Sequence, residues 1–425
     1  MKLFPSSPPP GPFREEFWRS PLRGPWLTSL LGLVLLIGLP ILALTGLLSN
    51  LAYDPGFASN DVGTTAGLLG WVPFRWPAHP VWLYALTQGT HVALGLALSP
   101  ILLAKLWSVI PKLFEWPPVR SPAHVVERLS LLFLVASGLF EFATGILNIQ
   151  NDYAFGFFFT PVHYYGAWVF IAAVSFHVAI KLPKMRRSLK TRSLLASLRE
   201  DVAHTGPDTA DPHAPAVKLA LPPSTMTRRV LLGTVGGASA LLGFQGLGQS
   251  LGGPLRGLAF LAPRGRNPLG GPNGFQINKS FAASFIDPGS VNHSWRLTVQ
   301  GRRMVTFTRE QLLAMPQRHY DLPIACVEGW STTQRWSGVR MRDLAALAGT
   351  PRPTDLTTQS LEQNGLYSTI TWSPTQAWAD EALLALQVNR TDLSLDHGFP
   401  ARAIGPAIPG VHCTKWITML TFAKA

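Results

Sequence analysis

Cysteine is scarce in this sequence. Only Cys326 and Cys413 occur among 425 residues, and both lie in the last third. If that third is exported, a structural disulfide between them is one interpretation. The alternative is that Cys326 ligates a metal while Cys413 is a small buried residue. The residues around Cys326 favour this alternative, because they form a motif and not only a spacing.

Charge is also scarce. Only 14% of the residues are charged, against 47% that are hydrophobic. This chain is too apolar for an ordinary soluble enzyme of its length, so the composition predicts membrane spans. The net charge of +13 would suit a nucleic-acid-binding protein, but the basic residues fall mostly in short runs beside apolar segments. That pattern is typical of membrane topology, so we expect a membrane and no nucleic acid as partner.

Four apolar segments predict a bundle of transmembrane helices. Residues 24–53 carry no charge, and at about 1.5 Å per residue they easily cross the hydrocarbon core, with a bend at Pro40. Further spans are expected at about residues 80–107, 129–150 and 160–182. Loops rich and poor in Lys and Arg alternate, which places the Pro-rich lead, residues 1–23, and the region around Lys184 in the cytoplasm.

Histidines inside these spans are candidate heme ligands, because histidine is costly in a bilayer. His163 and His177 are fourteen residues apart, which places them near one helix face and about 21 Å apart. This resembles the last helix of the four-helix b-type cytochromes of formate dehydrogenases and hydrogenases and of bacterial cytochromes b561. His91 lies at the depth where a heme bound by His163 needs its second ligand. Bis-histidine iron suits electron transfer.

A second heme is less well specified. In the resembled cytochromes the partner of His177 lies on the first helix, and residues 24–53 contain no histidine. His124 could replace it, or His177 could stand without a heme. Glu141, within the third span, is either a structural partner of the heme pocket or a proton relay at a quinone site, with the quinone role slightly favoured.

The motif around Cys326 reads IACVEGWS over residues 324–331, followed by QRWSG at residues 334–338. A soft thiolate on a tight loop suits a transition metal. The stretch resembles the molybdenum-ligand loop of the sulfite oxidase family, which includes bacterial methionine sulfoxide reductase catalytic subunits. The resemblance implies that Cys326 ligates molybdenum of a molybdopterin cofactor. Ala325 stands where the family often has arginine, so the substrate stays open between a small oxyanion and a sulfoxide.

A second block, DHGFPAR at residues 396–402 followed by the KW block at residues 406–417, which ends in KWI, resembles the family segments that wrap the pterin. The resemblance implies that the residues of this block and one upstream asparagine bind the cofactor, namely Asn278, His397, Arg402, His412 and Lys415. His412 stands where the family usually has arginine, so phosphate affinity there is expected to depend on pH. Tyr367 matches, weakly, a tyrosine that lines the substrate pocket. Each also has a structural alternative, such as a turn cap or an ion pair.

The last third predicts a mixed α+β domain. Residues 295–299 and 304–308 alternate like strands about Gly301, and residues 309–314 and 343–348 read as short helices. The chain ends just after the KW block, so we do not expect the family's immunoglobulin-like dimerisation domain.

Upstream, TMTRRVLL at residues 225–232 followed by small apolar residues resembles a twin-arginine export signal. An ordinary fifth span with two arginines at its inner end is the alternative. Both place everything after about Ser250 outside the cytoplasm. The export signal is favoured, because a pterin cofactor assembled in the cytoplasm requires a domain that crosses the membrane already folded.

The sequence therefore predicts a multi-pass protein of the cytoplasmic membrane, with an all-α cytochrome b followed by an exported sulfite-oxidase-type domain that exchanges electrons with the quinone pool. The expected parts are a disordered lead (1–23), a four-helix cytochrome b (24–192), a cytoplasmic linker (193–224), a fifth helix (225–250), a second linker (251–274) and the molybdopterin domain (275–425). One competing hypothesis is an electron-transfer protein whose exported domain binds a partner without metal. Another is a transporter or receptor without heme.

Overall fold

The computed structural model describes residues 5, 7–53, 76–152, 154–206, 223–263 and 271–423. Parts of the expected lead and of both expected linkers lie outside these residues. The chain forms two compact units. The first contains Met1–Ala43, Leu94–Ile146 and Val162–Gly243, and the second contains Leu44–Ala93, Leu147–Pro161 and Phe244–Ala425.

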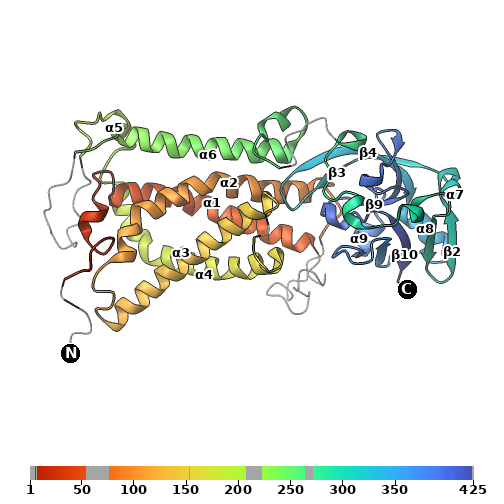
Figure 1. The fold of residues 1–425 in the computed structure, drawn as a ribbon, viewed down its shortest axis with the longest axis horizontal. Helices are drawn as coiled ribbons and strands as arrows, with labels where there is room; N and C mark the ends of the chain where they lie inside the picture. The colour runs from red at the N-terminus through yellow and green to blue at the C-terminus, as the bar shows by residue number, and fades with distance from the viewer. Residues whose placement is uncertain are drawn as a thin grey trace. The chain divides into compact units, whose positions relative to one another are not determined.

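The helices of the first half follow the predicted spans (Figure 1). They are α1 (Pro25–Ala52), α2 (Leu83–Val109), α3 (Pro122–Ile149), α4 (Phe159–Leu189) and α6 (Arg228–Leu251), with the short α5 (Leu194–Arg199) between the last two. In the described part of the chain, five helices are long and apolar enough to cross a membrane. These helices support the prediction of a membrane protein. α1 continues through Pro40.

Contacts inside the first unit pair the helices. Thr28 of α1 donates its hydroxyl to Ser108 of α2 at 3.0 Å, and Lys181 of α4 meets Glu127 of α3 at 3.2 Å. Trp26 and Leu27 of α1 are buried against side chains from α2 and α6. The expected bundle with a fifth helix packed on it therefore exists as an arrangement of helices.

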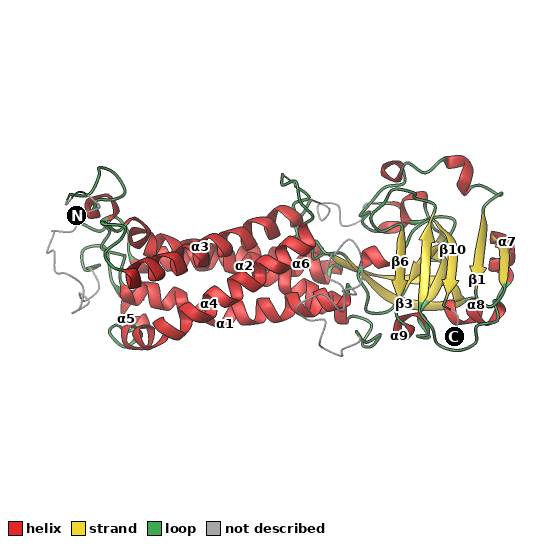
Figure 2. Cartoon of the chain, turned by 90° about the horizontal axis from the view of Figure 1, so that it is seen from below, coloured by secondary structure: helices red, strands yellow, loops and turns green. Residues whose placement is uncertain are grey.

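Strands occur only in the second unit among the described residues, and Figure 2 shows them in yellow. One sheet has the order β2-β1-β10-β5-β6, formed by β2 (Met304–Thr308), β1 (Arg296–Gln300), β10 (Ile417–Phe422), β5 (Leu356–Ser360) and β6 (Thr369–Trp372). The other has the order β3-β4-β7-β8, with β9 paired to β7, and is formed by β3 (Arg318–Ala325), β4 (Ser331–Arg340), β7 (Leu383–Val388), β8 (Thr391–Asp392) and β9 (Arg402–Ile404).

One apolar core joins the two sheets. Leu297 and Val299 of β1 alternate inward and are fully buried, as are Leu384 and Leu386 of β7. The short helices α7 (Arg309–Ala314), α8 (Met341–Leu347) and α9 (Pro374–Ala377) border the sheets. α7 begins at a capping box between Thr308 and Gln311, which satisfies amide donors that the first turn of a helix leaves unpaired. The predicted mixed domain, its first two strands and its first helix are confirmed.

Candidate active site

Cys326 lies on the hairpin loop between β3 and β4. The amide of Cys326 donates to Trp330 O at 2.9 Å and the amide of Gly329 to Cys326 O at 3.0 Å, which closes a tight turn. Gly329 has a φ of +89°, a left-handed conformation that favours glycine. The thiol is buried, and no disulfide joins it to Cys413, which is also buried. The disulfide interpretation of this cysteine pair is therefore wrong.

The Cys326 loop borders the segment that contains His412. Ala325 forms a parallel bridge with Pro409, and a Cβ on Gly410 would come 2.9 Å from Ala325 O. Gly410–His412 is a short 3-10 helix, η9, followed at once by Cys413. The KW block thus starts beside the cysteine loop, although more than 80 residues separate the two motifs in the sequence.

Arg402, at the start of β9, is a buried cation with an unused hydrogen-bond donor. Its side chain is 1% exposed. Its Nε donates to Cys413 O at 3.2 Å and its Nη1 to His397 O at 3.4 Å, whereas the buried Nη2 has no hydrogen-bond partner among the described residues. Burial lowers the pKa of Arg402 to about 10, and no described carboxylate offsets it. A buried cation without a counter-charge is costly, so the site is built for an anion.

His397, in η8 (Leu395–His397), lies beside Arg402. Its ring stacks on Phe275 with centroids 3.7 Å apart, and its Nε2 is buried with no hydrogen-bond partner in the described part of the chain. Burial, and next the positive charge of Arg402, lowers the pKa of His397 to about 3. The ring is therefore neutral near pH 7 and leaves one nitrogen for a ligand.

Lys415, in the KW block, hydrogen-bonds to the segment that contains Asn278 and to the DHGFP segment. Its Nζ donates to Lys279 O and to Asp396 O, both at 2.7 Å. Lys279 follows Asn278, which is half-buried in the segment before the first strand. Gly398 packs directly on Lys415, because a Cβ there would come 3.1 Å from the lysine Cβ. The structure thus brings Asn278, His397, Arg402 and Lys415 to one place, with Lys415 acting through backbone carbonyls.

His412 and Tyr367 are close to the same region but differ from expectation. His412 is buried, and burial lowers its pKa to about 3. These surroundings do not favour the pH dependence near neutrality that the sequence suggested. Tyr53, at the end of α1, packs edge-on against the His412 ring at 5.4 Å. Tyr367 is half-buried on the loop between β5 and β6. Tyr53 was missed, because nothing in its local sequence marks it.

The buried donors fit a phosphate-bearing cofactor with a metal at Cys326. An oxyanion would accept a hydrogen bond from Arg402 Nη2, and also from His397 Nε2 in the tautomer that carries the ring proton there. Arginine is suited to phosphate. Among the described residues no group of three or more His, Cys, Asp or Glu side chains is placed to hold a metal ion. Neither of the expected metals requires such a group, because the expected molybdenum centre takes one thiolate ligand from the protein and a bis-histidine heme takes two imidazole ligands.

The membrane histidines are placed as follows. His163 Nδ1 lies 3.0 Å from Glu141 Oε2 and 3.2 Å from Thr144 Oγ1. His91 belongs to the second unit, where a Cβ on Gly46 of α1 would come 2.7 Å from its ring. Because His163 belongs to the first unit, the pairing of the two histidines stays a prediction. The Glu141 contact favours the structural role for this carboxylate over the quinone role.

His124 lies in the first turn of α3, and its Nδ1 accepts the amide of Arg120 at 3.2 Å in an exposed setting. His177 lies within α4. Arg228, the first arginine of the twin-arginine motif, is fully buried and pairs with Glu200 at 3.0 Å, whereas Arg229 is exposed. Arg228 therefore has a structural role in the folded chain, which either interpretation of the fifth helix allows.

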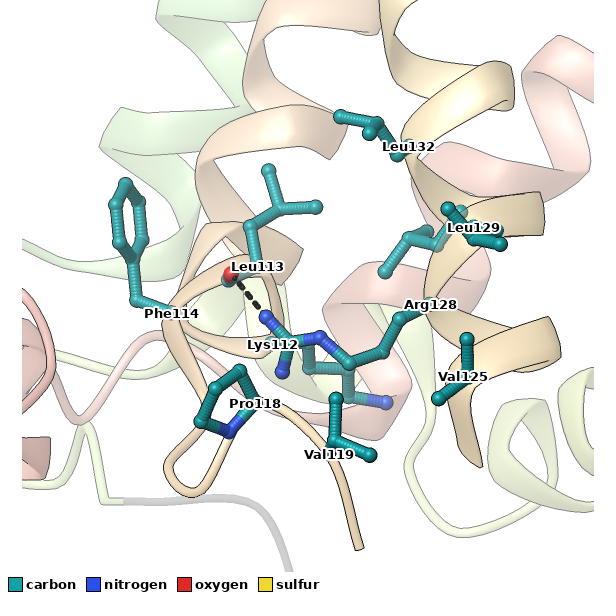
Figure 3. Close-up of a pocket in the computed structure, with 10 residues that line it drawn as sticks. Lys112, Leu113, Phe114, Pro118, Val119, Val125, Arg128, Leu129 and Leu132 are labelled. Atoms are coloured by element: carbon teal, nitrogen blue, oxygen red, sulfur yellow. Dashed lines mark hydrogen bonds between the residues drawn. The ribbon is translucent and has the colours of Figure 1, made fainter. Parts of the chain in front are cut away.

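A cavity of about 470 Å³ lies elsewhere in the first unit (Figure 3). It is bordered by Lys112, Val125, Arg128 and Leu132, and Arg128 Nη2 donates to Leu113 O at 2.8 Å. None of the residues predicted to bind pterin or heme lines it. This cavity is not part of the site around Cys326.

Comparison with known proteins identifies the last third of the chain. Residues 286–425 match the family model "Oxidoreductase molybdopterin binding domain". An uncharacterised oxidoreductase, YuiH of Bacillus subtilis, is 29% identical over 133 residues, covering 31% of this chain and 66% of that protein. A nitrate reductase of Volvox carteri is 25% identical over 208 residues, covering 38% of this chain and 24% of the relative.

Two further matches are a plant sulfite oxidase and a bacterial crystal structure. A sulfite oxidase of Arabidopsis thaliana is 30% identical over 96 residues, covering 19% of this chain and 24% of the relative. The crystal structure of the sulfane dehydrogenase SoxCD from Paracoccus pantotrophus matches with 22% identity and a TM-score of 0.28, covering 31% of this chain and 39% of that one. The chain thus spans less than two thirds of each curated relative. Residues 286–425 are thus similar to oxidoreductase molybdopterin binding domains, and the relatives of the chain include a sulfite oxidase and a nitrate reductase, which supports the resemblance that the sequence indicated.

Proposed function

We propose that the chain is a membrane-bound molybdenum oxidoreductase. In this proposal a molybdopterin at Cys326 supplies two-electron oxygen-atom transfer, and heme b in the helices exchanges single electrons with the quinone pool. The substrate is a small oxyanion of the sulfite type or a sulfoxide. Electrons flow from the catalytic domain to the quinone pool if sulfite is oxidised, and from the quinone pool to the catalytic domain if a sulfoxide is reduced. The catalytic domain lies outside the cytoplasm, as the alternation of basic loops favours.

The observation that carries the proposal is the uncompensated charge of Arg402. Its guanidinium is buried with Nη2 unused, and the neighbouring His397 offers a second unused buried nitrogen. Such groups cost free energy unless a ligand pairs with them. The terminal phosphate of a pterin cofactor has the charge and the acceptors that both need.

The residues of this chain have separate roles in the proposal. Cys326 holds the metal, Arg402 and His397 bind phosphate, and Lys415 fixes the segment of Asn278 against the DHGFP loop. Tyr367 borders the substrate side. The protein contributes position and electrostatics, whereas the cofactor contributes the reaction itself.

The heme part is supported by the orientation of His163. A metal-ligating histidine almost always donates its other ring nitrogen to a carboxylate or carbonyl. The Glu141 carboxylate occupies that position at Nδ1, 3.0 Å away, and in the proposal Nε2 is the nitrogen that binds iron. We propose one heme, bound by His91 and His163.

Cofactor analysis of the detergent-purified full chain tests the proposal. We expect about one molybdenum and one pterin per chain, with a heme b spectrum that changes on reduction. Heme without molybdenum would overturn the catalytic part and support the competing hypothesis of a binding module. A colourless protein would overturn the cytochrome part and support a transporter or receptor.

A further inference from the structure

Six consecutive carbonyl groups of the cysteine loop have identified donors. Two are satisfied within the loop, since Cys326 O accepts from the Gly329 amide and Trp330 O from the Cys326 amide. The other four accept from side chains that are distant in sequence. Val327 O, Glu328 O, Gly329 O and Ser331 O each have such a partner.

The first of these donors comes from α2. Gln88 is 6% exposed, and its Nε2 donates to Val327 O at 2.6 Å. The helix approaches the loop closely, because a Cβ on Gly329 would come 2.6 Å from Val92 Cγ1. Gln88 precedes His91 by three residues, so one turn of α2 carries both the loop contact and the proposed heme ligand.

The other donors come from the end of α6 and the turn that follows it. Gln249 Nε2 donates to Glu328 O at 3.0 Å and Ser250 Oγ to Gly329 O at 2.8 Å. Arg256, in η4 (Gly253–Leu258), donates from Nη2 to Ser331 O at 2.6 Å. Gln249 is 1% exposed and Arg256 4% exposed. All three bonds are buried and are not surface contacts.

All of these residues belong to the second unit, so the contacts lie within one compact body. α2 and α6 also touch each other there. A Cβ on Gly246 of α6 would come 2.6 Å from Ala93 Cα of α2, and a Cβ on Gly89 would collide with Ser250. Small residues at these points let the two helices approach closely enough for Gln88 and Ser250 to reach Val327 O and Gly329 O of the same loop.

We propose that Gln88, Gln249 and Ser250 are positioning residues for the Cys326 thiol, so that helices α2 and α6 complete the metal site of the sheet domain. This inference rests on the proposed function, which makes Cys326 the metal ligand. Without these donors Val327 O, Glu328 O and Gly329 O would each lose a hydrogen bond that holds the loop in place, and a lost hydrogen bond to a carbonyl costs stability. The loop would then open, and the thiol would lose its fixed direction.

Site-resolved alkylation tests the proposal on the cofactor-free full chain in detergent. The rate of maleimide reaction is measured at Cys326 and Cys413 by peptide mass spectrometry, for the wild type and for Gln88→Leu, Gln249→Leu and Ser250→Ala. We expect labelling of Cys326 to be about tenfold faster in the variants, as opening becomes easier by the equivalent of one hydrogen bond, while Cys413 reacts at the wild-type rate.

Gln376→Leu is the matched control. Gln376 is also buried, and its Nε2 donates to Trp76 O at 2.6 Å, but among the described residues it has no hydrogen bond to the cysteine loop.

Unchanged labelling of Cys326 in the three variants would overturn the proposal. Equal acceleration at Cys326 and Cys413 would overturn it too, because the whole domain would then be loosened. Ser250→Ala removes a single hydroxyl, so this variant serves if a glutamine variant fails to fold. A chain that never binds molybdenum would defeat the proposed function and leave this test valid.

Discussion

Glu141 Oε2 lies 3.0 Å from His163 Nδ1, and this pair joins α3 to α4. Glu141 is 7% exposed, and Gly166 of α4 leaves the space for its carboxylate, because a Cβ there would collide with Oε1. A carboxylate bonded to the far nitrogen of an imidazole fixes the tautomer and raises the basicity of the ligand nitrogen. The pair therefore has the arrangement that a metal-ligating histidine and its carboxylate partner would have.

Replacing Glu141 by Gln is expected to keep the heme and raise its midpoint potential. The neutral amide donates less electron density to the iron ligand, which disfavours the ferric state. The expected shift is on the order of 60 mV, equivalent to a tenfold change for one electron. Glu127→Gln is the control, since Glu127 pairs with Lys181 across the same two helices but is 65% exposed. The midpoint potential is measured by optical redox titration. Equal potentials in wild type and Glu141→Gln would contradict the proposal that His163, with Glu141 at its Nδ1, ligates the heme iron.

Single histidine variants test whether the chain binds one heme or two. His91→Ala and His163→Ala are expected to lose the heme b spectrum, because each removes an axial ligand. His124→Ala and His177→Ala are expected to keep it. Heme per chain is measured by the pyridine hemochrome method. Half the heme lost in His177→Ala would show that a second heme exists and that our assignment of one is wrong.

Arg402→Met is expected to have opposite effects on binding and on stability. Pterin content should fall by more than tenfold, because the buried phosphate partner is gone. The cofactor-free protein should unfold at a higher temperature than the cofactor-free wild type, since a buried cation without a counter-charge is removed. Arg340→Met is the control, because Arg340 pairs with Asp343 at 2.8 Å. A lower unfolding temperature for cofactor-free Arg402→Met would contradict the account.

The stability of the cofactor-free chain is expected to fall on acidification below about pH 6.5, the ordinary pKa of histidine. Burial lowers the pKa of His397 and of His412 to about 3. Between these values the unfolded chain binds protons that the folded chain does not, so stability is full above pH 6.5 and is lost towards pH 3. The slope is up to about 1.4 kcal/mol per pH unit for each residue.

Calorimetric unfolding between pH 7 and pH 4 measures this slope. His397→Gln and His412→Gln should each lose less stability across the range than the wild type. His293→Gln replaces an exposed histidine and should behave like the wild type. The same pH slope in all four proteins would show that the two buried histidines are protonated in the folded state.

The sequence was sufficient for features with a local or periodic signal. Apolar runs predicted α1 to α4 to within a few residues at most ends, because the bilayer demands length and hydropathy together. The alternation in residues 295–299 predicted β1, which the structure forms at Arg296–Gln300, and within this strand only Leu297 and Val299 are buried. The family motif singled out Cys326 and Arg402, and the match of residues 286–425 supports the family from which they were inferred.

Contacts between distant segments were not predictable in the same way. Gln88, Gln249 and Ser250 look like ordinary polar residues at the ends of apolar helices, and only the fold brings them to successive carbonyls of one loop. Glu141 was read with a slight preference for a quinone site, because its hydrogen-bonding partner lies on another helix. His412 was expected to titrate, because its complete burial cannot be read from a short motif.

X-ray absorption at the molybdenum edge tests the central claim most directly. The full chain is compared with Cys326→Ser and Cys413→Ser, which each replace a buried thiol of the same domain. The account predicts one fewer sulfur neighbour of molybdenum in Cys326→Ser and no change in Cys413→Ser. The same number of sulfur neighbours in Cys326→Ser as in the wild type would contradict it.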